Sequence, residues 1–225
     1  MVEDQELHSH DRSYPFSIQQ LDFKGLVVYG IDFPLFFDRD GIYSDGYHAY
    51  SDNAERFAFF SMAALSAARA MNFQPDVVHC NDWHTALTPF FLKKDESGFF
   101  NKTKSVLTIH NGAYQCQNEF SQVPFLHPFD ELSRRTDDHG SINFLKIGIE
   151  FSNKINAVSP NYARELLTPM GSHNLFEDFK HREYDMSGIL NGCDYNKWDP
   201  TTDPHIAANY DLSLIHISEP TRLRS

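Results

Sequence analysis

The chain has 225 residues, of which 41% are hydrophobic and 14% are aromatic. This content is enough to bury a core, so we expect one large or two small folded domains and exclude a disordered chain. The formal net charge of −12 argues against a binder of phosphate backbones, which needs a basic face, and we predict no nucleic-acid partner.

The cysteines and the N-terminal stretch indicate the compartment. Cys80, Cys116 and Cys193 are far apart and odd in number, which favours reduced thiols inside a cell over a disulfide framework. The stretch from Met1 to Phe16 is polar and acidic, and no run approaches the roughly 18 apolar residues of a membrane helix. We therefore expect a soluble protein without a secretion signal and without a membrane partner.

Strand-like and helix-like runs alternate along the chain. The apolar, β-branched run 26–32 predicts a strand, and the run 54–71 predicts a helix with N-cap candidates at 51–53. The same reasoning predicts a helix at 160–167, entered by Ser159 at its N-cap and Pro160 at its first position. The remaining predicted elements are strands within 75–80, 104–111, 154–160 and 184–194, and helices at 85–94 and 142–152.

This order of elements predicts the fold class. Strand, helix, strand, helix in succession implies βαβ units, and hence an α/β protein with a Rossmann-like, doubly wound, mostly parallel sheet. Ligands of such sheets bind outside the carboxyl ends of the strands. Polar clusters follow four predicted strands, and we expect them to converge on one rim of the sheet. These clusters are 79–84, 110–115, 159–165 and 191–200.

The stretch "DVVHCNDWHTAL" carries the densest polar cluster and allows three interpretations. His79, Asp82 and His84 are possible metal ligands, but strand alternation points His79 and Cys80 to opposite faces, and zinc sites usually add further Cys or His ligands nearby. We therefore predict no metal. A structural turn, in which Asn81 and Asp82 cap the following helix and the histidines are packed, stays open. A catalytic loop is the third interpretation.

Six stretches resemble motifs of bacterial glycogen synthases and plant starch synthases, in the order of that family. Four are "DVVHCNDWHTAL", "SVLTIHNGAYQ", "INFLKIGIEFSNKINAVSPNYAREL" and "GILNGCDYNKWDP". Two earlier ones are "GIDFPLFFDRDGIY" and "AYSDNAERF". The resemblance runs from about Gly30 to about Tyr210, and six motifs in order are specific where one would be weak.

The resemblance implies a fold and an activity. The fold is the N-terminal, acceptor-side Rossmann-like half of a two-domain GT-B glycosyltransferase. The activity is transfer of glucose from ADP-glucose to the non-reducing end of an α-1,4-glucan, with retention of configuration. The implied partners are the glucan and the sugar nucleotide, which is a donor substrate, so we expect no separate cofactor. The implied compartment is the bacterial cytoplasm, or the plastid stroma of a plant or alga.

The sequence also departs from this family. It lacks the Lys-Thr-Gly-Gly loop that follows the family's first strand, and it lacks the C-terminal half. We therefore expect residues 1–24 to be a polar segment of the same domain, 25–210 an incomplete catalytic domain, and 211–225 a non-native tail that resembles a translated sequencing adapter. Such a fragment is expected to be inactive alone. A related glucosyltransferase with another sugar nucleotide, or a non-catalytic glucan-binding module, stays open.

The resemblance also implies roles for single residues. Asp82 would orient the sugars and stabilise charge without acting as a nucleophile, since glycosyl transfer passes through an oxocarbenium-like transition state. His110 would place a carbonyl near that charge and a ring nitrogen on a sugar hydroxyl. Asn111 would contact the donor glucose, and Asn191 would bind a sugar hydroxyl. A helix cap at Asp82 and a buried structural histidine at His110 are the structural alternatives.

Two tyrosines are further candidates for substrate binding. Tyr43 and Tyr114 offer amphipathic ring faces of the kind that pack on sugars. For Tyr114, packing in the core is an equally good interpretation.

Overall fold

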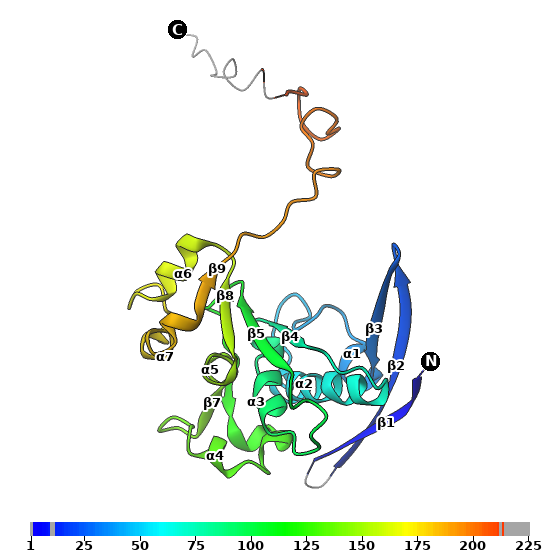
Figure 1. Ribbon diagram of the computed structural model, residues 1–225, viewed down its shortest axis with the longest axis vertical. Helices are drawn as coiled ribbons and strands as arrows, with labels where there is room; N and C mark the ends of the chain where they lie inside the picture. Colours follow the sequence, from blue (N-terminus) through cyan, green and yellow to red (C-terminus); the bar gives the residue numbers. More distant parts are fainter. Residues whose placement is uncertain (1, 10–11, 212, 214–225) are drawn as a thin grey trace. The chain divides into compact units, whose positions relative to one another are not determined.

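The computed structural model describes residues 2–9, 12–211 and 213 of the chain (Figure 1). The chain divides into two compact units, Met1–Ile189 and Leu190–Ser225. The described helices and strands all belong to the first unit. In the described part of the second unit the backbone consists of turns and bends, and its residues are mostly exposed.

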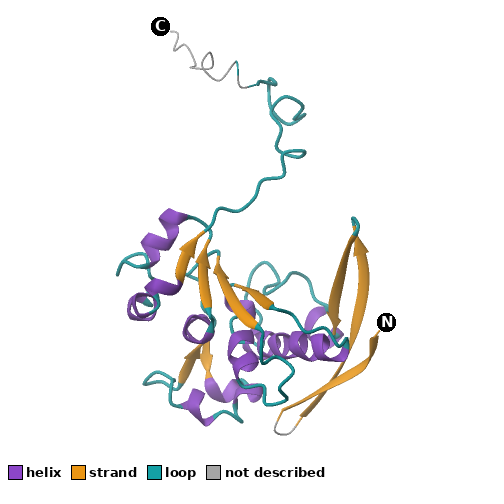
Figure 2. Cartoon of the chain, in the orientation of Figure 1, coloured by secondary structure: helices purple, strands orange, loops and turns teal. Residues whose placement is uncertain are grey.

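The first unit contains a parallel sheet and a separate antiparallel sheet (Figure 2). The parallel sheet has the strand order β4-β5-β8-β9, and its strands are β4 (Val77–Asn81), β5 (Lys104–Ile109), β8 (Lys154–Ala157) and β9 (Met186–Gly188). The antiparallel sheet consists of β1 (Val2–Ser9), β2 (Arg12–Phe23) and β3 (Leu26–Asp32). A short ladder pairs β6 (Gln117–Glu119) with β7 (Ser141–Asn143).

Helices follow the strands of the parallel sheet, which confirms the predicted Rossmann-like α/β class. The α-helices are α1 (Pro34–Phe37), α2 (Asn53–Ala70), α3 (Thr88–Lys93), α4 (Asp130–Ser133), α5 (Phe144–Phe151), α6 (Pro160–Leu166) and α7 (Phe176–His181). Four 3-10 turns lie at Trp83–Thr85, Phe120–Gln122, Pro124–Leu126 and Glu183–Asp185.

The helix starts were predicted with mixed success. Ser159 caps α6 as predicted, because its hydroxyl accepts the Tyr162 N–H at 2.9 Å. Asp52 stands at the N-cap position of α2 but makes no cap hydrogen bond. Its carboxylate instead accepts two hydrogen bonds from the Arg39 guanidinium, at 2.8 and 2.6 Å. The Asp52 carboxylate therefore makes charge-assisted hydrogen bonds with Arg39 and does not cap the helix.

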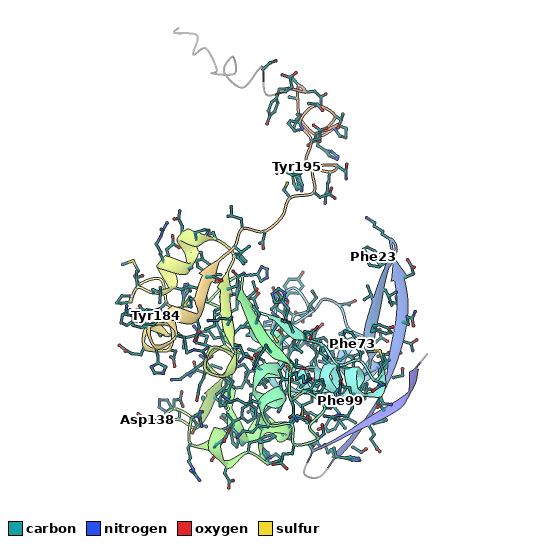
Figure 3. The ribbon with its side chains drawn as sticks, viewed as in Figure 1. Phe23, Phe73, Phe99, Asp138, Tyr184 and Tyr195 are labelled. Carbon is teal, nitrogen blue, oxygen red and sulfur yellow. The ribbon has the colours of Figure 1, made fainter. Side chains whose placement is uncertain are left out.

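The predicted strand 26–32 forms as β3, but in the antiparallel sheet and not in the parallel one. It joins β2 through a two-residue turn at Lys24 and Gly25, both with positive φ, as tight hairpins require. Figure 3 places Phe23 at the tip of this hairpin. Strand β2 was not predicted, although Tyr14, Phe16 and Ile18 alternate as buried residues with polar neighbours.

An apolar groove of about 630 Å³ lies between β3, helix α2 and β4. β3 is an edge strand of the antiparallel sheet and β4 is an edge strand of the parallel sheet. Val27, Phe73 and Val77, which line the groove, are each more than half exposed.

Helix α5 lies close to the segment that follows β4, because Gly148 carries no side chain at the contact. A Cβ atom at Gly148 would lie 2.7 Å from the Cβ of Ala86, 2.9 Å from its carbonyl oxygen and 3.0 Å from Leu107 Cδ2. Such distances leave no room for a methyl group. The segment that leads out of β4 toward the polar rim is therefore held by a backbone contact with α5.

We expect Gly148→Ala to lower the free energy of unfolding by about 1–3 kcal/mol, because the added methyl group must displace Ala86 or α5. Gly30→Ala is the matched control, since a Cβ atom there meets only Gln19 O at 4.0 Å. Urea unfolding of both variants measures the difference. Equal stability of the two variants would contradict the close packing of α5.

Candidate active site

The backbone of Asp82 turns sharply where β4 ends. Its N–H still donates to Thr108 O at 2.9 Å, which extends the pairing of β4 with β5 by one residue. Its φ of 53° and ψ of −170° then fall in a region that residues other than glycine rarely occupy. Strained backbone of this kind persists only where surrounding contacts enforce it, and it concentrates at functional sites.

The carboxylate of Asp82 joins the loop after β4 to the loop after β5. Its Oδ1 accepts the backbone N–H of His110 at 2.8 Å and that of Asn111 at 3.4 Å. No side-chain cap bond is made at the turn Trp83–Thr85, so the predicted helix cap by Asp82 is wrong. Thr85 holds that turn instead, because its hydroxyl bonds both the N–H and the carbonyl of Asn81.

The ring of His110 is oriented by a second bond between the same two loops. Its Nε2 lies 3.0 Å from Asn81 Oδ1. An amide oxygen only accepts, so Nε2 carries the proton in this arrangement, and Nδ1 of the neutral ring is left as an acceptor. His110 is exposed, and the predicted buried structural histidine is therefore wrong. Asn111 accepts the Ala113 N–H on its Oδ1 at 3.0 Å, and no other described residue bonds its NH2 group.

A third strand end is tied to the same place. The hydroxyl of Tyr162, on the helix that follows β8, accepts the N–H of Gly112 at 2.7 Å. Burial raises the pKa of Tyr162, so this hydroxyl stays protonated at neutral pH. Gln115 donates to Gly112 O at 2.9 Å and to His173 O at 2.8 Å. The ends of β4, β5 and β8 are thus brought together at one rim.

A cavity of about 690 Å³ opens beside Asp82, and four of the predicted site residues line it. These are Tyr43, Asp82, Asn111 and Tyr114. Both tyrosines are exposed, at 45% and 60%, so core packing of Tyr114 is excluded and its ring is available to a ligand. The other lining residues are Ala49, Tyr50, Ser51, Asn53, Trp83, His84, Gln115, Cys116, Gln117 and Asn118.

An aromatic cluster forms part of the cavity wall. Trp83 and His84 stack at 3.9 Å between ring centroids, and Phe57 lies edge-on to both at 4.8 Å. The ring of Tyr43 lies 5.7 Å from that of His84. His84 Nε2 is buried and finds no hydrogen-bond partner among the described residues. Burial lowers the pKa of His84, although the nearby Asp82 charge opposes this shift.

The remaining predicted features lie apart from this site. Asn191 is exposed in irregular backbone of the second unit, and its role stays a prediction. The predicted non-native tail lies, except for residues 211 and 213, outside the described residues. Among the described residues no three His, Cys, Asp or Glu side chains gather as metal ligands. In the same part of the chain, no helix is long and apolar enough to cross a membrane.

Comparison with known proteins gives the family of this chain. The family described as "Starch synthase catalytic domain" matches residues 2–181. The chain belongs to this starch synthase family. The match reaches further toward the N-terminus than the motif resemblance, which began at about Gly30.

Individual members of the starch synthase family are also similar to this chain. Glycogen synthase of Aeromonas salmonicida is 46% identical over 202 residues, covering 88% of this chain and 41% of the relative. That of Photobacterium profundum is 43% identical over 208 residues, covering 90% and 41%. The solved "Catalytic domain of Starch Synthase IV from Arabidopsis thaliana bound to ADP and acarbose" superposes with a TM-score of 0.77 at 29% identity, covering 94% and 44%. The chain thus spans about two fifths of these relatives.

We expect substitutions of Asp82 to separate backbone strain from hydrogen bonding. Asp82→Gly and Asp82→Ala both remove the carboxylate, but only Ala keeps a Cβ atom at positive φ. Ala should therefore be less stable than Gly by about 1–3 kcal/mol. Asp82→Asn should be closest to the wild type in stability, because its Oδ1 still accepts both backbone N–H groups. Denaturant unfolding measures the order, and equal stability of Gly and Ala would refute the strain.

We expect His84 to make the folded state sensitive to acid. Its lowered pKa means that the unfolded chain takes up the proton first, so stability falls as the pH drops below about 6.5. His84→Phe should keep the ring stack and lose less stability than the wild type between about pH 7.5 and pH 5. His139→Phe, at an exposed turn, measures the background effect of removing a histidine. An unchanged slope in His84→Phe would contradict the expectation.

Proposed function

We propose that this chain forms the acceptor-side half of a retaining glucosyltransferase, which moves glucose from ADP-glucose to the non-reducing end of an α-1,4-glucan. The observation that carries the proposal is the bond of the Asp82 carboxylate to the loop of His110 and Asn111, beside a cavity with exposed tyrosines. Support comes from the glycogen synthases named above and from the starch synthase IV catalytic domain, which is bound to ADP and acarbose.

The geometry of each side chain supports a particular role in the proposed reaction. The reaction builds positive charge at the anomeric carbon, and fixed carboxylates and carbonyls stabilise such charge without reorganising. Asp82 supplies a negative charge whose position two backbone N–H groups fix. His110 contributes its carbonyl, and its Nδ1 accepts a sugar hydroxyl. The free NH2 group of Asn111 donates to another hydroxyl.

The acceptor glucan would lie along the cavity between Tyr43 and Tyr114. Sugar rings expose apolar C–H faces as well as hydroxyl groups, and tyrosine offers a flat apolar ring with a polar tip. The cavity volume of about 690 Å³ lies within the range of small-ligand sites. The donor nucleotide would be bound largely by sequence outside these 225 residues, so we propose that the chain alone is inactive. The bacterial relatives favour the cytoplasm among the two predicted compartments.

The family match and the glycogen synthase relatives do not favour the alternative of a non-catalytic glucan-binding module. Calorimetry with maltooligosaccharides and with ADP-glucose separates binding functions. Acceptor binding without donor binding fits both the half-site and the module, so activity must be measured in a complete enzyme. A donor other than ADP-glucose would appear in the same complete enzyme as transfer from another sugar nucleotide.

We expect a chimera to show the catalytic part of Asp82. Residues 2–181 replace the corresponding segment of Aeromonas salmonicida glycogen synthase, and glucose transfer from ADP-glucose to glycogen is measured. Asp82→Asn should lower turnover about a hundredfold, since the fixed charge is lost while the amide acceptor remains. Asp138→Asn, at an exposed residue labelled in Figure 3, is the matched control and should leave turnover unchanged. An active chimera that is indifferent to Asp82→Asn would refute the proposed role.

A further inference from the structure

Arg56 is a buried cation in the first turns of α2. Its side chain is 1% exposed, and within the described residues it forms no ion pair. Its guanidinium donates to Phe36 O at 2.8 Å, to Asn53 Oδ1 at 2.7 Å and to Ile42 O at 3.1 Å. Burial, together with the nearby Arg39 charge, lowers the pKa of Arg56, and the charge of Asp52 opposes this shift. Because burying a charge costs free energy of desolvation, we expect Arg56 to have a role that a neutral side chain could not fill.

The planar fork of arginine suits this position. Three of its nitrogens reach acceptors on helix α1, on the loop that follows it and on the first turn of α2, which the single ammonium of lysine cannot do in the same plane. The guanidinium also lies over the rings of Tyr50 at 5.1 Å, Phe57 at 5.4 Å and Phe37 at 5.7 Å. These contacts fix the direction of all its N–H groups.

Arg56 orients the side chain of Asn53, and Asn53 in turn holds Tyr43. Because Asn53 Oδ1 accepts from Arg56, its Nδ2 faces the other way and donates to Tyr43 O at 2.9 Å. The same carbonyl accepts the Tyr50 N–H at 3.0 Å. Two successive hydrogen bonds therefore tether Tyr43 to helix α2.

This tether reaches the proposed sugar cavity. The segment 43–53 supplies one wall of the cavity, including the ring of Tyr43. The residue after Arg56 is Phe57, whose ring packs against Trp83 and His84 of another wall. The start of α2 thus touches two walls at once, and Arg56 itself does not line the cavity.

We propose that Arg56 is a positioning residue for the acceptor sugar: through Asn53 it fixes the distance between the Tyr43 wall and the wall of Trp83 and His84. This inference rests on the proposed function, because it assigns the cavity to a glucan. It assigns to Arg56 control of acceptor affinity without contact with the acceptor. The prediction is that affinity changes when the tether is broken, even where stability does not.

Asn53→Asp is the separating variant. Its carboxylate keeps the bond to Arg56 and makes it an ion pair, so the melting temperature should be unchanged or higher. It cannot donate to Tyr43 O, so the affinity of the 225-residue chain for maltotetraose should fall about tenfold or more. Arg56→Lys should lower affinity similarly. Arg135→Lys, which alters an ion pair with Glu150 away from the cavity, should leave affinity unchanged.

The double variant distinguishes positioning from direct contact. If Asn53 acts only through the tether, adding Asn53→Asp to Arg56→Lys should cost little further affinity. Full additivity of the two losses would show a direct sugar contact by Asn53 and overturn the inference. Wild-type affinity in Asn53→Asp would overturn it as well.

A ligand-free measurement keeps the two proposals distinguishable. The NMR signals of the Tyr43 and His84 rings should shift in Asn53→Asp and stay in place in Arg135→Lys, because only the former releases Tyr43. Unchanged ring signals in Asn53→Asp would overturn the tether whatever the sugar does. Shifted ring signals together with no maltotetraose binding by the wild type would confirm the tether and refute the glucan site.

Discussion

The bond between one carboxylate and the backbone of a neighbouring loop organises the rim of this protein. Asp82 ends β4 in a backbone conformation that costs free energy, and in return its Oδ1 meets the N–H groups of His110 and Asn111. The His110 ring and the Gly112 amide are then fixed by Asn81 and Tyr162. Without the first bond, the loops after β4 and β5 would be joined only by the contact of His110 Nε2 with Asn81 Oδ1 and by the pairing of their strands.

The cavity beside Asp82 depends on contacts of a different kind. Its aromatic wall is held by packing of Phe57 on Trp83 and His84. Burial lowers the pKa of His84 and thereby favours its neutral form. Its other wall is held by polar bonds that start at the buried Arg56. Charge is therefore placed where a sugar would react, and flat apolar rings are placed where a sugar would lie. This arrangement supports the proposal of a glucan acceptor site.

Local signals in the sequence predicted the parallel strands and the helix cap at Ser159, whereas Asp82 and Asn111 were identified through the family resemblance. Strand alternation and cap chemistry act over a few residues, so they are readable from the chain. The partner of the Asp82 carboxylate lies 28 residues away, and the acceptors of Arg56 include a carbonyl 20 residues away. No local pattern encodes such bonds, and the cap assigned to Asp82 failed for that reason.

The central claim is that the Asp82 carboxylate holds the amides of His110 and Asn111. Amide hydrogen exchange in the wild type and in Asp82→Gly tests it most directly, because glycine removes the acceptor without adding strain. We predict that His110 exchanges slowly in the wild type and much faster in Asp82→Gly, while Leu107 and Ile109 inside β5 stay protected in both. Equal protection of His110 in the two proteins would contradict the account.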